Sequence, residues 1–168
     1  MKILACAAAL FSLSGAAMAQ QSPASAKPVV VSIANAEGQA VGTATLSPAA
    51  SGVKIVLDIK KLPPGEHSIH IHQVAKCDPP DFKTAGPHFA AAGHSHDSAP
   101  AGDIPDFALI VGKDGTAHVS TVAPNVTMGD DDRSVFSNGG TAIVIHAVAG
   151  GTGSGAPPRI ACGVITKP

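Results

Sequence analysis

Glu66-His67-Ser68-Ile69-His70-Ile71-His72 is the stretch of sequence that decides the fold. Polar and apolar residues alternate along it, with the period of a β-strand that buries one face. Successive side chains of a strand point to opposite faces, so His70 and His72 project from one face and Ile69 and Ile71 from the other. Two imidazoles on one face of a strand are half of a metal site, since neutral imidazole binds copper, zinc, iron and nickel. The alternative is a pair of exposed histidines on an edge strand.

The first 28 residues are predicted to precede the folded domain. A positive start at Lys2, an apolar run over 3–13 and the small-x-small motif Ala17-Met18-Ala19 predict a secretory signal peptide over 1–19. Residues 20–28 are rich in Gln, Ser, Pro and Ala, which predicts a flexible leader. We therefore expect cleavage near Ala19, a periplasmic or secreted protein, and a single domain over 29–168.

The rest of the chain has the pattern of an all-β protein. The whole chain contains 18 glycines and 14 prolines but no Trp or Tyr, and its β-branched runs are short. Strands are expected at 29–34, 40–46, 53–59, 66–72, 106–111, 116–122, 141–146 and 159–165. Eight short strands separated by turns predict a Greek-key β-barrel or sandwich of immunoglobulin-like architecture.

Two long segments lack a periodic pattern. Residues 73–105 are unusually long for a loop in a compact domain, and such loops are generally functional or disordered. We interpret this one as functional because it contains several histidines and aspartates. In the second segment, 124–140, the run Asp130-Asp131-Asp132 predicts a solvated turn.

Charge and cysteine content give further evidence on the partners of the protein and on a disulfide. The chain has 11 basic and 12 acidic residues, a balance that does not suggest a nucleic acid or membrane partner. Cys77 and Cys162 are the cysteines that follow the signal peptide. An exported chain with two cysteines most simply forms one disulfide. In the chain-entropy model, closing the loop from Cys77 to Cys162 stabilises the folded protein by about 4–5 kcal/mol.

Five segments resemble those of the copper/zinc superoxide dismutases, in the same order along the chain. The strand with His70 and His72 resembles that family's copper-binding strand. The other four segments are 85–89, 102–105, 142–147 and 159–165. The resemblance extends from about Val29 to Ile165, and it implies the family's eight-stranded barrel.

The resemblance also implies a function and its residues. It indicates a superoxide dismutase, which converts superoxide to dioxygen and hydrogen peroxide by copper redox cycling. The implied copper ligands are His70, His72, His88 and His146. His88 would also bridge to a second metal and carry a proton, and Arg159 would be the cation that attracts the superoxide anion. Cys77 and Cys162 would tie the long loop to the last strand, while His67 matches a buried structural histidine.

The zinc site that the resemblance implies is incomplete. It would consist of His88, His96, Asp103 and one more histidine, but Pro100 stands at that position. His94 could replace the missing ligand if the loop bends between the two neighbouring histidines. Structural zinc sites are almost always four-coordinate, and only three zinc ligands are secured here. The sequence therefore does not decide whether zinc binds, and we favour a copper-only state.

A different class of function is a superoxide dismutase-like protein that buffers or delivers copper or zinc without turnover. The segment 94–97, His-Ser-His-Asp, would suit such a carrier. Arg159 and His88 favour the enzyme, because a carrier needs neither an anion-attracting cation nor a bridging histidine. A structural domain with incidental histidines is a third reading, and His118, expected to be exposed, belongs to it. The sequence leaves a monomer and a homodimer equally open.

Overall fold

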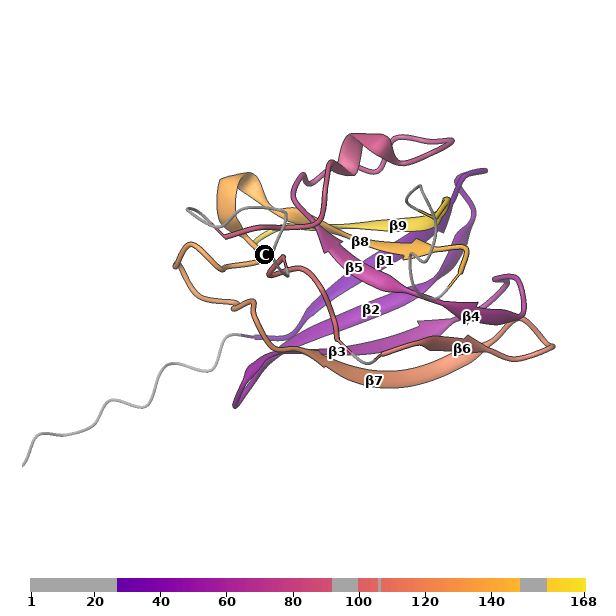
Figure 1. Ribbon diagram of the computed structural model, residues 1–168, viewed down its shortest axis with the longest axis horizontal. Coiled ribbons are helices and arrows are strands. Elements are labelled where there is room, and N and C mark those ends of the chain that lie inside the picture. Colours follow the sequence, from indigo (N-terminus) through magenta and orange to yellow (C-terminus); the bar gives the residue numbers. More distant parts are fainter. Residues whose placement is uncertain (1–26, 92–99, 106, 149–156) are drawn as a thin grey trace, which may run out of the picture.

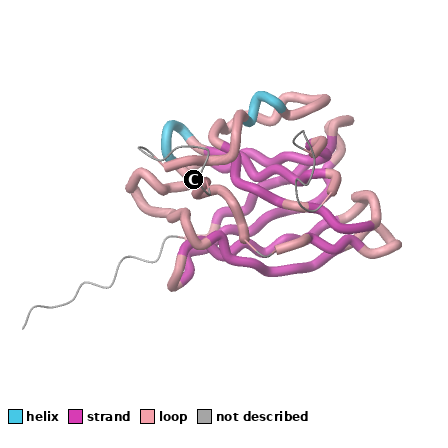
Figure 2. The backbone as a smooth tube through the Cα atoms, viewed as in Figure 1, coloured by secondary structure: helices cyan, strands magenta, loops and turns pink. Residues whose placement is uncertain are grey.

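The computed structural model describes residues 27–91, 100–105, 107–148 and 157–168. Within them the protein is all-β, as predicted, apart from two single-turn 3-10 helices (Figure 2). No helix in this part of the chain is long and apolar enough to cross a membrane. The predicted signal peptide and most of the predicted leader lie outside the described residues. The elements, in order, are β1 Val29–Asn35, β2 Ala40–Ala49, β3 Gly52–Ile59, β4 Gly65–His67, β5 Ile69–His72, η1 Lys83–Ala85, β6 Leu109–Val111, β7 Ala117–Ala123, η2 Ser137–Gly139, β8 Thr141–His146 and β9 Arg159–Ile165.

The strands form two antiparallel sheets that together curl into a barrel (Figure 1). Seven strands pair in the order β5-β8-β9-β1-β2-β3-β7, and β4 pairs with β6. A tight turn over 112–116 joins β6 to β7. The connections from β3 to β4 and from β7 to β8 link strands that are not neighbours in the sheet, as in a Greek key.

The histidine strand closes this barrel. The sequence predicted one strand over 66–72, whereas the structure divides it at Ser68 into β4, which pairs with β6, and β5, which pairs with β8. Ser68 stays in the hydrogen-bond network, because its carbonyl accepts from the N–H of His146 at 2.9 Å. With β4 and β5 counted as one bent strand, the barrel has the eight strands that the sequence predicted.

The barrel interior is aliphatic. In β3, Val53, Ile55, Leu57 and Ile59 point inward, and the residues between them are more exposed. This alternation is typical of a strand with one buried face. The inward side chains of the other strands complete the same core.

Strand β8 differs, because all six of its residues are buried. Its outward-facing Ala142 and Val144 are covered by Phe82 and Ala85 from the loop that follows β5. Figure 1 shows this loop, with η1, beside β8 and β9, and η1 contacts β8. The uninterrupted apolar run of the β8 sequence reflects this second cover.

Candidate metal centre

Four histidines from three segments meet on the outer face of β5 and β8. His70 and His72 lie on β5, and His146 ends the neighbouring β8. His88 comes from the loop after η1 and forms an isolated bridge with His72. One ligand atom from each of the four lies within 4.8 Å of the others. Within the described residues, this is the one such cluster of three or more His, Cys, Asp or Glu.

Backbone carbonyls fix the ring orientation of two of these histidines. His72 Nδ1 lies 2.9 Å from the carbonyl oxygen of Gly86, and His146 Nδ1 lies 3.1 Å from that of Pro157. A carbonyl oxygen only accepts hydrogen bonds, so each Nδ1 carries the proton and donates it. Because a neutral imidazole has a single N–H, each Nε2 is left with a free lone pair.

The two free nitrogens face each other. His72 Nε2 and His146 Nε2 are 3.3 Å apart. Burial is the main cause that lowers the pKa of His72 to about 3, and burial also lowers the pKa of His146, so both rings are neutral near pH 7. Two lone pairs cannot hydrogen-bond to each other, and a cation between them is what makes this arrangement favourable.

His70 supplies a third ring nitrogen that a bound cation would stabilise. Its Nδ1 is buried and has no hydrogen-bond partner. Burial, followed by repulsion from His88 and His146, lowers the pKa of His70 to about 3. A buried ring nitrogen without a hydrogen-bond partner is costly unless a metal binds it. The donor set fits copper, for which imidazole is a preferred ligand.

His88 is oriented by a carboxylate. Its Nδ1 lies 2.7 Å from Asp103 Oδ1, and both side chains are about a third exposed. Nδ1 therefore donates to Asp103, which leaves Nε2 to face the other three histidines. The sequence suggested Asp103 as a zinc ligand and did not identify this hydrogen bond.

Arg159 is fixed beside the cluster by the same loop that carries His88. Its two terminal nitrogens donate to the carbonyl oxygens of Phe82 and Gly86, each at 2.7 Å. The Gly86 oxygen thus accepts from both Arg159 and the His72 ring. Burial lowers the pKa of the Arg159 guanidinium, and the charge of Asp81 opposes this shift. An arginine nevertheless stays cationic in proteins.

The predicted disulfide is present and anchors this loop. Cys77 and Cys162 are bonded, with their Cα atoms 5.6 Å apart. The bond joins the loop after β5 to β9, the strand on which Arg159 also lies.

The remaining histidines differ in role. The ring nitrogens of His67 lie at the carbonyl oxygens of His146 and Pro63, at 3.0 and 2.8 Å, so His67 links β4 to the end of β8. His118 is exposed, as expected. His94 and His96, the remaining candidates for a zinc site, lie outside the described residues.

Sequence reasoning missed the groups that hold the histidine ligands and Arg159 in place. Three of them are the backbone carbonyls of Phe82, Gly86 and Pro157. A carbonyl is common to every residue type, so no sequence signal marks these three.

Comparisons with known proteins agree with this geometry. The copper/zinc superoxide dismutase family matches residues 40–165. "Superoxide dismutase [Cu-Zn] 1" of Aquifex aeolicus is 38% identical in an alignment of 148 residues that covers 79% of this chain and 84% of that protein.

Two solved structures extend the likeness to the fold. A double mutant of a SOD-like protein from Bacillus subtilis has a TM-score of 0.71 and 29% identity, covering 82% of this chain and 97% of that one. The monomeric copper, zinc superoxide dismutase of Salmonella enterica has a TM-score of 0.62 and 28% identity. This match covers 83% of this chain and all of that one.

Proposed function

The chain belongs to the copper/zinc superoxide dismutase family, and we propose that His70, His72, His88 and His146 bind the copper at which it converts superoxide to dioxygen and hydrogen peroxide. The observation that carries this proposal is the pair of lone pairs 3.3 Å apart on His72 and His146, beside the unpartnered Nδ1 of His70. Bound copper supplies the one-electron redox chemistry, alternating between Cu(II) and Cu(I).

The histidine rings are held before any metal arrives. Gly86, Pro157 and Asp103 fix three of them through Nδ1. Partners of this kind orient metal-bound histidines and set which nitrogen is free. The ligands therefore need little movement when the charge of the metal changes, which favours fast electron transfer to and from superoxide.

Arg159 is proposed to attract and position the anion. A guanidinium has five N–H groups, and two of them are committed to Phe82 and Gly86. The others remain available to superoxide. Because Arg159 and His72 share the Gly86 oxygen, the positive charge is held next to a copper ligand. A focused positive potential raises association rates by about 10–1000-fold.

His88 is proposed to supply a proton. Its Nδ1 is engaged with Asp103, so Nε2 is the ring nitrogen that would carry the proton. The ring is about a third exposed, which allows it to exchange protons with solvent. The peroxide product requires two protons in all, and His88 is placed to deliver one of them.

Copper loading followed by stopped-flow measurement of superoxide decay tests the function. We expect one copper per chain and copper-dependent decay that is lost in His146→Ala and kept in His118→Ala, a change of an exposed histidine outside the cluster. Stoichiometric copper binding without superoxide decay would instead indicate a carrier.

Export and assembly complete the proposal. Residues 1–19 are proposed to direct the chain out of the cytoplasm, with the mature domain acting in the periplasm as a monomer or homodimer. N-terminal sequencing of periplasmic protein should begin near Gln20, and sedimentation should give the assembly state. A mature protein that still begins at Met1 would contradict the export proposal.

A further inference from the structure

A turn presents Asp103 to His88. The N–H of Asp103 donates to the carbonyl of Pro100 at 3.0 Å, which closes a four-residue turn over 100–103. Pro100 stands where the resemblance expects a zinc histidine. In this chain the position therefore supplies a backbone acceptor for the turn instead of a metal ligand.

The turn is fastened to the strands that carry the copper ligands. Gly102 lies between Ile71 of β5 and Phe89, the neighbour of His88. Its N–H donates to the Phe89 carbonyl at 2.8 Å, and its carbonyl accepts from the N–H of Ile71 at 2.9 Å. A Cβ at position 102 would lie 2.1 Å from the Ile71 oxygen, so only glycine fits this close approach. The backbone thus holds the residues next to Asp103 and His88 together.

The distance between the two side chains is that of a hydrogen bond. His88 Nδ1 and Asp103 Oδ1 are 2.7 Å apart. Two ligands about 2.0–2.1 Å from one tetrahedral zinc would lie about 3.3 Å from each other. The described residues therefore do not show zinc-site geometry at His88, but a direct contact between donor and carboxylate.

We infer that Asp103 is a positioning residue that orients His88 by direct hydrogen bonding, so that the copper centre is assembled without zinc. The inference rests on the proposed copper site, because it concerns the orientation of one of its four ligands. Asp103 does not touch the reacting atoms. Its carboxylate accepts from Nδ1, keeps the ring aligned, and leaves Nε2 for copper, as outer-shell carboxylates do for other metal-bound histidines.

Three variants test whether Asp103 or a zinc ion orients His88. Asp103→Ala removes the acceptor, Asp103→Asn keeps an acceptor oxygen, and the double variant His94→Ala/His96→Ala removes the two other zinc candidates. The readouts are the Cu(II) electron paramagnetic resonance spectrum and the copper dissociation constant, neither of which requires turnover. Asp132→Ala, which changes an exposed aspartate in the 124–140 segment, controls for loss of a surface charge.

We expect Asp103→Ala to shift the spectrum and weaken copper binding by roughly 10- to 100-fold, the usual cost of losing such a partner. Asp103→Asn should recover most of the affinity, and the double variant should match the parent protein, with or without added zinc. The inference is overturned if the double variant changes as Asp103→Ala does, or if Asp103→Ala leaves the spectrum unchanged. If Asp103→Ala does not fold, Asp103→Asn and the double variant still test the inference. If zinc oriented His88, both of these variants would lose the parental spectrum. Failure of the proposed function is a separate result: the parent protein would bind copper and not consume superoxide.

Discussion

Two segments of this barrel, 73–91 and 124–140, both lack a periodic sequence pattern but are held in different ways. The first is fastened to distant parts of the chain. The Cys77–Cys162 disulfide, the two Arg159 hydrogen bonds and the buried side chain of Phe82 all join it to β8 or β9. It also carries His88 to the histidines of β5.

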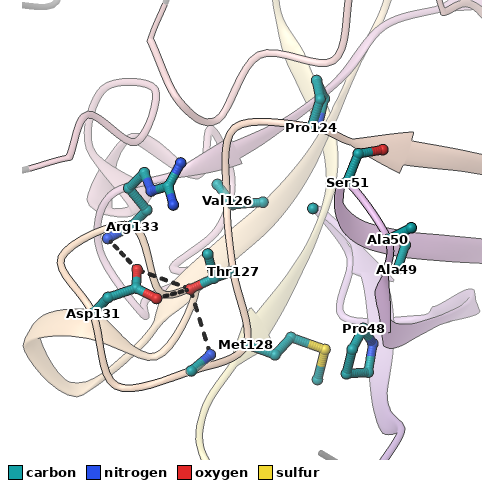
Figure 3. Close-up of a pocket in the computed structure, with 12 residues that line it drawn as sticks. Pro48, Ala49, Ala50, Ser51, Pro124, Val126, Thr127, Met128, Asp131 and Arg133 are labelled. Carbon is teal, nitrogen blue, oxygen red and sulfur yellow. Dashed lines mark hydrogen bonds between the residues drawn. The ribbon is translucent and has the colours of Figure 1, made fainter. Parts of the chain in front are cut away.

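The hydrogen bonds of the second segment join mainly its own residues, while its Val126 and Val135 are buried in the barrel core. Asp131 accepts from the hydroxyl of Thr127 and the N–H of Arg133, and the hydroxyl of Ser134 donates to the Gly129 carbonyl at 2.6 Å. Figure 3 shows Asp131 with its hydrogen bonds to Thr127 and Arg133, beside a pocket of about 550 Å³ between the β2–β3 turn and the segment. None of the four clustered histidines lines that pocket.

The difference shows how a loop can be made suitable for catalysis. Local hydrogen bonds give the 124–140 segment a shape, but they leave it independent of the metal centre. Long-range bonds make the shape of the 73–91 segment part of the metal centre. Breaking them should therefore affect either copper binding or the reaction with superoxide, whereas breaking the network around Asp131 should affect neither.

Removal of the disulfide should have the largest effect. A Cys77→Ser/Cys162→Ser variant is expected to lose about 2–5 kcal/mol of unfolding free energy, and to bind copper more weakly because the loop of His88 is freed. Urea unfolding and a copper titration measure the two effects. Equal copper affinity in the variant and the parent would show that the loop does not need this anchor.

Acid should act on the metal-free centre. His70 and His72 have a pKa of about 3 in the folded protein, against an ordinary value of 6.5. Between these values the unfolded state binds more protons, so the stability of the metal-free protein should fall as pH decreases from about 6.5 toward 3. Thermal unfolding across this pH range tests it, with the copper-loaded protein as the comparison. A flat profile above pH 4 would contradict the lowered pKa values.

Loss of Arg159 should slow capture of superoxide. Arg159→Ala is expected to keep copper bound but to lower the rate by roughly tenfold or more at low salt, and to reduce the dependence on ionic strength. Arg159→Lys separates charge from anchoring, because it keeps the charge but cannot reproduce the two-pronged hydrogen bonding to Phe82 and Gly86. The steering role is wrong if Arg159→Ala retains the parental rate and salt dependence.

The network around Asp131 should give the smallest effect. Asp131→Ala removes two hydrogen bonds of an exposed turn and should cost about 1 kcal/mol of unfolding free energy, with no change in copper affinity or superoxide decay. A loss of copper in this variant would mean that the two segments are not independent.

Much of this arrangement follows from sequence patterns. Alternation predicted the inward residues of β3, and β8 and β9 have the predicted bounds, because each has a strong apolar or β-branched run. The break at Ser68 was not predictable, since no glycine or proline marks it and only pairing with two different strands reveals it. The four histidines could be proposed from their motifs, but their free nitrogens could not. Those are set by Gly86, Pro157 and Asp103, which become neighbours of the rings only in the folded chain.

A crystal structure of the copper-loaded protein, with copper located by its anomalous signal, tests the central claim most directly. We expect one copper bound by Nδ1 of His70 and by Nε2 of His72, His88 and His146, at about 2 Å by analogy with zinc–nitrogen distances. The Nδ1 atoms of His72 and His146 should still donate to Gly86 and Pro157. Copper bound at His94 and His96 instead, or at the cluster through the Nδ1 atoms of His72 and His146, would contradict the account.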